Sequence, residues 1–313
     1  MGYDPYDALN SSIIRRLPSK FLKLAFTQFF VYSPVNLRPF FGVKKGVNPK
    51  ALGLVMRACC NLFKMGYLDG NALNEKLRIL DSMLEEKRSM GYSGHCWGFN
   101  FPWQDLTRFS KSYLPTVVNT STISNGYLDA YEITGDERYL KKAESACKFI
   151  IKDLNRYEND YGICLSYTPI DRNVVHNASL LGAEVLFRVG EEICNDEYKD
   201  LAKNLVDFSL AYQRNDGSWP YSLNPSKGIE RMQIDFHQGF VIDSLITMRK
   251  LKNMDMAIKK GADFYFRNQF EDGLTLWRYP KKRPRDIHHQ AQGLITSSRM
   301  YLEFGDRKYK KIN

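Results

Sequence analysis

The 313-residue chain contains no stretch of roughly 18 uncharged apolar residues, so the sequence predicts no membrane-spanning helix. Its first residues, Met1–Pro5, are not a basic flank leading into an apolar run, and we expect no secretory signal there. The six cysteines form no C-x-x-C pair and no zinc-ribbon spacing, which predicts free thiols that pack as small apolar groups. These absences together predict a soluble, cytoplasmic protein.

Several binding classes are excluded in the same way. The chain has no RNA-binding aromatic motif, zinc finger or clear helix-turn-helix signature. We therefore expect no nucleic-acid partner, although the net charge is +10. No two histidines have the i, i+4 spacing of a zincin helix, and we expect neither a metal nor a cofactor. The positive charge instead indicates simple solubility, an anionic membrane surface or an acidic substrate.

From residue 48 onward the chain repeats one unit with a period of about 55–60 residues. Each unit has two helices and a short aromatic segment built around glycine. The first helices are expected to begin near Asn48, Thr116, Val174, Gln233 and Ile287, and the second helices to follow residues 70–71, 135–136, 195–196 and 253. The glycine segments, which predict short hairpins, are residues 94–99, 161–167, 216–221 and 272–279.

This pattern predicts an all-α fold, an α/α toroid of repeated helix pairs with short β-hairpins at one mouth. The first helices are poor in charge and the second are amphipathic, as expected for an inner ring wrapped by an outer ring. Residues 36–313 would form this single domain, which can bury a large core because 43% of the chain is hydrophobic.

Residues 1–35 form a separate N-terminal amphipathic segment in this interpretation. Its stretch from Leu9 to Tyr32 could supply the missing outer helix that closes the ring. The same stretch combines four basic residues with six apolar ones, which favours, as the alternative, peripheral contact with the inner membrane surface through residues 9–32. These residues are Arg15, Arg16, Lys20 and Lys23 with Phe21, Leu22, Leu24, Phe26, Phe29 and Phe30.

In such a ring the N-termini of the inner helices converge on one mouth, so polar residues there are candidates for a site. Four of the five histidines lie at the starts of first helices. The catalytic candidates are Asp235, His237, Asp286 and His288. The substrate-binding candidates are Trp97, Trp103, Gln104, Asp105, Asn119, Tyr167, His176, Asn177, Trp219, Tyr221 and Gln292.

These residue types suit carbohydrate chemistry. Asp235 or His237 could act as general acid or base, and the carboxylates of Asp235 and Asp286 could instead hydrolyse a glycoside if their separation permits. Aromatic rings offer flat faces to sugars, although many such rings only pack in a core. Helix N-termini and the basic residues between Arg278 and Arg285 favour an anionic ligand.

Four stretches carry a resemblance to known proteins: residues 36–42 (NLRPFFG), 96–104 (CWGFNFPWQ), 216–219 (DGSW) and 286–292 (DIHHQAQ). Over about residues 36–304 the chain resembles a family of prokaryotic α/α-toroid proteins associated with surface-polysaccharide biosynthesis. Some members are labelled delta-aminolevulinic acid dehydratase, a TIM-barrel enzyme whose pattern this repeat does not match. Where the family pattern has Asn and Thr, this chain has Asp235 and Gln238.

The helix-pair pattern is also similar to the C-terminal toroid of glucuronyl C5-epimerases, and more distantly to prenyltransferase and squalene-cyclase repeats. The Asp-x-Asp-Asp motif of the cyclases is absent. The resemblance implies an enzyme that modifies or cleaves an acidic, uronate-containing glycan or a lipid-linked saccharide, by epimerisation, elimination or hydrolysis. The alternative is a non-catalytic glycan-binding or assembly scaffold protein.

Overall fold

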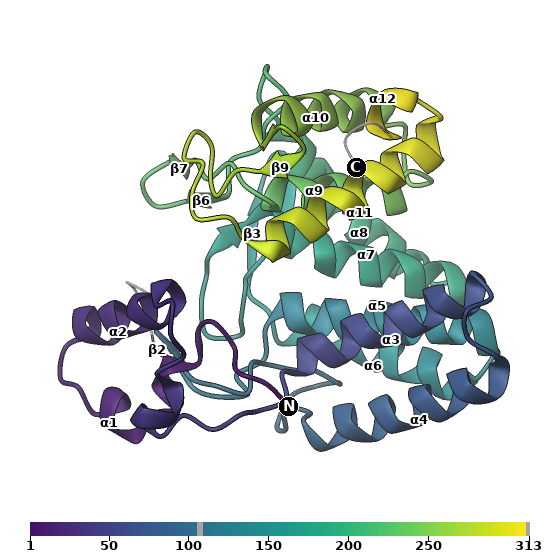
Figure 1. The fold of residues 1–313 in the computed structure, drawn as a ribbon. Coiled ribbons are helices and arrows are strands. Elements are labelled where there is room, and N and C mark those ends of the chain that lie inside the picture. Colours follow the sequence, from purple (N-terminus) through teal and green to yellow (C-terminus); the bar gives the residue numbers. More distant parts are fainter. Residues whose placement is uncertain (105–108, 311–313) are drawn as a thin grey trace. The chain divides into compact units, whose positions relative to one another are not determined.

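The computed structural model describes residues 1–104 and 109–310, and these form two compact units, residues 1–153 and 154–313 (Figure 1). Both units are built from paired helices with short strands between them. The five cysteines other than Cys194 are buried as free thiols. None of the helices in the described ranges is long and apolar enough to cross a membrane.

The first unit begins with four short or medium helices. These are η1 (Asp7–Asn10), α1 (Ser12–Arg15), α2 (Lys20–Tyr32) and η2 (Arg38–Phe41). They enclose a small core of Ala8, Leu9, Ile14, Phe30 and Val43. The buried carboxylate of Asp7 accepts a hydrogen bond from the Arg38 guanidinium at 2.6 Å, which ties the start of the chain to η2. Residues 1–35 are therefore part of the first unit, and the closing of the ring by residues 9–32 stays a prediction.

Two helix pairs complete the first unit. Helix α3 (Pro49–Lys64) packs against α4 (Gly70–Glu86) and α5 (Val117–Thr134), and α5 packs against α6 (Glu137–Lys152). Strands β1 (Trp103–Gln104) and β2 (Phe109–Ser110) pair antiparallel between α4 and α5 in the chain. A Cβ on Gly53 would lie 2.8 Å from the Cα of Ile123, so glycine there lets α3 and α5 approach closely.

The second unit continues the same pairing (Figure 1). Its first helices are α7 (His176–Glu192), α9 (His237–Thr247) and α11 (Ile287–Phe304), and α9 packs between the other two. Behind them lie α8 (Asp196–Ala211), α10 (Asp255–Asn268) and α12 (Arg307–Lys310) respectively. The strands are β3 (Arg156–Asn159), β4 (Gly162–Leu165), β5 (Val174–Val175), β6 (Ser222–Asn224), β7 (Ile229–Arg231), β8 (Phe270–Glu271) and β9 (Leu274–Thr275).

The predicted helix starts are confirmed to within a few residues, and the largest difference is at α9, which was expected near Gln233 and begins at His237. Several of these starts are marked in the sequence by capping side chains. Asn48, Asp136 and Asn195 each accept a hydrogen bond from a backbone N–H in the first turn of α3, α6 and α8. The first helices are also the more buried ones: every residue of α5 from Val117 to Ala130 is buried. An inner row of helices backed by amphipathic outer helices is what the charge contrast predicted.

Two of the four predicted hairpins are confirmed and two are wrong. Asp160-Tyr161 forms the turn between β3 and β4, with Gly162 as the first residue of β4, and Asp272-Gly273 turns between β8 and β9. Residues 94–99 contain no strand, only a bridge from Gly98 to Pro115. Asp216-Gly217 forms a turn that leads to buried Trp219, and the hairpin of that repeat is β6–β7, after the segment instead of within it.

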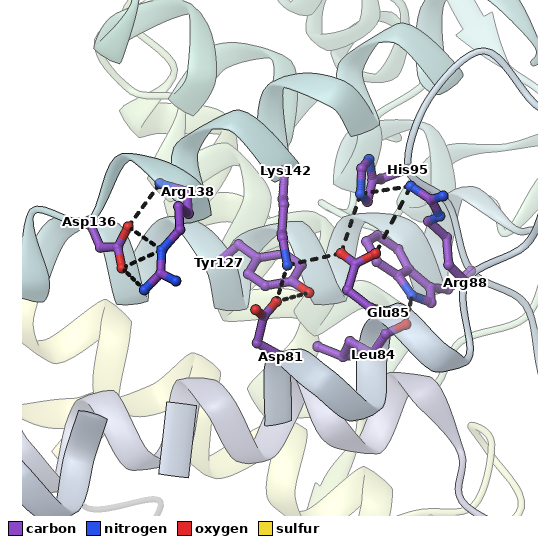
Figure 2. Close-up of polar contacts among 10 residues, drawn as sticks. Asp81, Leu84, Glu85, Arg88, His95, Tyr127, Asp136, Arg138 and Lys142 are labelled. Carbon is purple, nitrogen blue, oxygen red and sulfur yellow. Dashed lines mark hydrogen bonds and ion pairs between the residues drawn. The ribbon is translucent and has the colours of Figure 1, made fainter. Parts of the chain in front are cut away.

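A charged network joins the outer helices of the first unit (Figure 2). The Lys142 ammonium of α6 lies between the carboxylates of Asp81 and Glu85 on α4, 2.9 Å from Glu85. The phenol of buried Tyr127, on α5, donates to Asp81 at 3.0 Å. His95 adjoins the same network through Glu85, so one lysine ties α4 to α6 across the face of α5.

Candidate functional site

The second unit brings three histidines together at the N-termini of two neighbouring helices. His237 is the first residue of α9, and His288 and His289 lie in the first turn of α11. Asp286 caps α11 by accepting from the backbone N–H of His288 at 2.8 Å. Because α9 packs against α11, the two helix starts lie side by side.

The ring of Phe236 is the common contact of these histidines. Its centroid lies 4.1 Å from that of His237, 4.3 Å from that of His288 and 4.6 Å from that of His289. No pattern in the sequence distinguished Phe236 from other aromatic residues. The arrangement places three imidazoles around one apolar ring; we call His237, His288 and His289 the histidine cluster.

One carboxylate holds His237 in a fixed orientation. Asp235 is 2% exposed, and its Oδ1 lies 2.5 Å from Nδ1 of His237. Burial opposes the charged form of Asp235, but hydrogen bonds from His237 and Gln233 outweigh it and lower the pKa of the carboxyl group. An ionised carboxylate only accepts, so Nδ1 of His237 carries the hydrogen and Nε2 is left for chemistry.

His289 is oriented by a backbone carbonyl instead. Its Nδ1 lies 3.2 Å from the carbonyl oxygen of Leu276, which can only accept, and its Nε2 lies 4.0 Å from Oδ2 of Asp286. Burial lowers the pKa of His289, although the Leu276 bond and the nearby carboxylates oppose the shift. The indole of Trp277 stacks on the imidazole at 5.1 Å and 4°, which fixes the ring plane. A neutral imidazole with its Nε2 lone pair available is a competent base.

Two arginines and a tyrosine border the cluster. Nε of Arg278 lies 3.8 Å from Oδ2 of Asp235, and 41% of its side chain is exposed. The Tyr221 ring contacts His237 edge-on at 4.7 Å and carries the Arg231 guanidinium over its face at 5.4 Å. Arg231 also donates to Gln233 at 3.0 Å. These residues give the cluster a basic and aromatic border.

His176 and Asn177 lie at the start of α7, where the backbone N–H of His176 donates to the carbonyl oxygen of Tyr221 at 3.3 Å. His176 is fully buried between the rings of Phe208 and Tyr212, at 5.5 and 5.2 Å, and burial lowers its pKa to about 4. Within the described ranges neither ring nitrogen of His176 has a hydrogen-bond partner. The sequence grouped His176 with the other helix-start histidines, and its contacts instead are those of an apolar packing residue.

Two of the three tryptophans expected to face a sugar have no exposed ring surface. Trp97 donates from Nε1 to the carbonyl of Leu84 at the end of α4, and Trp219 donates to Ser209 near the end of α8. Each indole thereby ties its glycine segment to the preceding outer helix. These contacts position the segments.

A polar side chain near the start of each of α5, α7, α9 and α11 holds the backbone of the preceding glycine segment. In each case a backbone N–H of the segment donates a hydrogen bond to the side-chain oxygen, over 2.9–3.2 Å. The donors are Trp97, Leu165, Trp219 and Thr275. We call the accepting residues the clamp residues: Thr120, Ser179, Gln238 and Gln290. The side-chain amide of Gln238 both accepts from and donates to the backbone of Trp219.

The remaining candidates are dispersed. Trp103 and Gln104 form β1, and Asp105 lies outside the described residues. Asn119 is fully buried in the first turn of α5, where its side-chain amide finds no partner among the residues that the structure describes. Tyr167 lies half-buried in the loop after β4, and its backbone N–H donates a hydrogen bond to the carboxylate of Asp171.

Gln292 belongs to a buried polar network one turn below the histidine cluster. Its amide donates to Oδ2 of Asp243 at 2.6 Å, and Thr296 donates to the same oxygen at 3.2 Å. Burial raises the pKa of Asp243 to about 6, while Arg299 opposes the shift. Gln292 therefore braces α9 against α11 below the imidazoles.

The described residues contain no group of three or more histidine, cysteine or acidic side chains placed to hold a metal ion. No family model matches the sequence, and no curated protein matches it.

Solved structures do share the fold. A GH76 α-mannanase of Bacteroides thetaiotaomicron is 14% identical with a TM-score of 0.63, covering 85% of this chain and 71% of that one. The cellobiose 2-epimerase of Bacillus thermoamylovorans is 12% identical with a TM-score of 0.61, covering 87% and 76%. An unsaturated glucuronyl hydrolase specific for heparin is 16% identical with a TM-score of 0.62, covering 84% and 71%. The chain therefore has the α/α-toroid fold that its repeats predicted.

Proposed function

We propose that the chain is a carbohydrate-active enzyme that moves protons with the imidazoles of His237 and His289. The observation that carries the proposal is their arrangement: each ring is fixed through its Nδ1, and no described residue hydrogen-bonds its Nε2. The His237 side chain is 18% exposed, and His289 is buried at 3% exposure. The likeness in fold to a mannanase, an epimerase and a glucuronyl hydrolase supports a sugar as the substrate class.

The carboxylates favour proton transfer over glycoside hydrolysis. A glycosidase needs one carboxyl group to protonate the leaving oxygen and another to attack or activate water. Here Asp235 is buried and engaged by His237, and Asp286 caps α11. Asp235 is thus a positioning residue, as the buried aspartate of a catalytic triad is. Among epimerisation, elimination and hydrolysis, we therefore propose one of the first two.

The substrate we propose is an acidic glycan, free or lipid-linked. In a uronate unit, Nε2 of His289 removes the proton from the carbon beside the carboxyl group, and the electron pair moves into that group as an enolate. Arg278 offers a cation to the developing charge. In this step His237 starts as the imidazolium, with Nδ1–H on ionised Asp235 and a second proton on Nε2; transfer of the Nε2 proton to the opposite face gives the epimer and leaves His237 neutral. Expulsion of the substituent on the next carbon gives the unsaturated product.

The test is proton NMR in deuterated water with a panel of uronate-containing oligosaccharides. Epimerase chemistry removes the C5 proton signal and elimination gives new vinyl signals. His237→Gln and His289→Gln each abolish that change, whereas His95→Gln, the same substitution in the first unit, preserves it. New reducing-end anomeric signals would replace the proposal with hydrolysis. Silence of the folded wild type across the panel would favour the scaffold alternative.

A further inference from the structure

Helix α2 is apolar on the face that packs and also on the face that does not. Its inward face buries Thr27 and Phe30, and Phe26 and Phe30 contact the Phe41 ring at 5.8 and 5.3 Å. Its outward face exposes Phe21, Leu22, Phe29 and Tyr32, with Phe21 63% exposed. We call these four residues the α2 face. A helix that is apolar all round is normally covered on every side.

The excess positive charge of the protein falls in the sequence segment that contains this helix. Residues 8–68 contain ten lysines and arginines and no aspartate or glutamate. The rest of the chain contains 35 basic and 35 acidic residues. The net charge of +10 therefore belongs to this one segment. Arg15 and Arg16 are exposed just before α2, and the Lys20 ammonium lies 5.5 Å from the centre of the Phe21 ring.

We propose that the α2 face docks on an anionic phospholipid surface, with its apolar side chains in the headgroup region and the flanking cations on lipid phosphates. Apolar insertion combined with basic attraction is the two-part signal that holds a peripheral helix at a membrane. Helix α2 has 13 residues, which suits lying in the interface and not spanning it. The proposal does not depend on the catalytic one, because no residue of the histidine cluster takes part.

The charge argues against the other occupants of this face. A second copy would bring the exposed cations beside this face, Arg15, Arg16 and Lys20, against their own counterparts. A nucleic-acid duplex would satisfy the cations but would leave Phe21, Phe29 and Tyr32 in water, because its phosphate backbone offers them no apolar contact. A lipid interface takes both the charge and the whole apolar face, including Leu22.

The experiment is co-sedimentation of the full chain with vesicles of phosphatidylcholine alone or mixed with phosphatidylglycerol. We expect binding to the mixed vesicles that falls with added salt. The double variant Phe21→Ser/Phe29→Ser should bind about tenfold more weakly or worse. Removing Arg15 and Arg16 should weaken binding about fivefold per arginine.

The matched control is Met256→Ser, which removes an 87% exposed apolar side chain from α10 in the other unit and should bind like the wild type. Thermal unfolding confirms that each variant is folded. Equal binding of the wild type and the Phe21/Phe29 variant, or no binding to the mixed vesicles, overturns the proposal. So does a wild-type dimer in light scattering that the same variant abolishes, since a second copy would then cover the α2 face.

Discussion

The histidine of the first unit and the histidine cluster of the second both lie beside carboxylates, but they differ in which ring nitrogens are already bonded. The Nε2 of His95 accepts from Arg88 at 2.9 Å and its Nδ1 bonds Ser145 at 2.8 Å, with Glu85 3.3 Å away (Figure 2). In His237, Nδ1 bonds Asp235, and no described residue bonds its Nε2. A fully bonded imidazole is structural, whereas a half-bonded one can exchange a proton with a ligand.

The surroundings enforce this difference. His95 lies in a network whose members pair with one another across α4 and α6, so its bonds stabilise the first unit. The histidine cluster surrounds the apolar ring of Phe236, which offers no hydrogen bonds. The comparison teaches that a histidine beside an acid is a weak signal of function until both nitrogens are accounted for.

The largest expected effect tests this contrast directly. His289→Gln removes the base and should lower turnover of a uronate oligosaccharide by about 10²–10⁴-fold, the usual contribution of general acid–base catalysis. The melting temperature should stay near that of the wild type. Turnover measured by NMR in deuterated water checks this. If His95→Gln lowers turnover equally, the assignment of roles to the two histidines is wrong.

The next effect concerns the tautomer of His237. Asp235→Asn can offer an amide N–H to Nδ1, which would move the ring hydrogen to Nε2, and turnover should fall by about 10²-fold or more. Asp7→Asn, which changes a buried carboxylate of the first unit, serves as the matched control. Measuring kcat and KM separately for the two variants distinguishes a catalytic defect from a binding defect, because a misoriented imidazole lowers kcat. An Asp235→Asn variant with normal kcat would remove the positioning role.

A smaller effect is expected at the network of the first unit. Lys142→Met leaves the carboxylates of Asp81 and Glu85 close together without their shared cation, and 18% of the lysine side chain is exposed. The loss should be about 1–2 kcal/mol in the free energy of unfolding. Urea unfolding of the wild type and the variant measures it. Lys148→Met, at a solvent-exposed pair with Glu144, is the control and should change little.

The smallest effect is a pH dependence. Burial lowers the pKa of His95 below its usual 6.5, so the folded state prefers the neutral ring. The unfolded chain then binds more protons, and the contribution of His95 to stability is present above pH 6.5 and declines as the pH falls below it. Unfolding of wild type and His95→Gln between pH 5 and 8 should differ in slope. Parallel curves would show that His95 does not titrate in this way.

The sequence predicted the helices well because their boundaries depend on local chemistry. Asn48, Asp136 and Asn195 cap helices wherever an apolar periodicity follows them. The hairpin at Asp216-Gly217 was wrong because that signal is equally a turn, and burial of Trp219 decided where the chain goes next. The burial of Trp219 depends on residues that are distant in the sequence, because its indole N–H donates to the carbonyl of Ser209 near the end of α8.

The candidate site was predictable only in part. The coincidence of histidines at helix starts led to His237 and His288, and the same reasoning grouped them with His176, which is buried between Phe208 and Tyr212. Contacts from Phe236 and Trp277 bring the cluster together, and no spacing in the sequence marks either ring. Side-chain packing across α9 and α11 is not encoded in a local pattern.

The clamp residues have a consequence for how this architecture can vary. The number of positions from a held N–H to its clamp residue is 23, 14, 19 and 15 in the four repeats, yet the bond is the same. Each loop is thus anchored to its own repeat and can lengthen or shorten between two fixed points without moving the helices. Such a scaffold can acquire a new specificity by exchanging one loop while its neighbours stay in place.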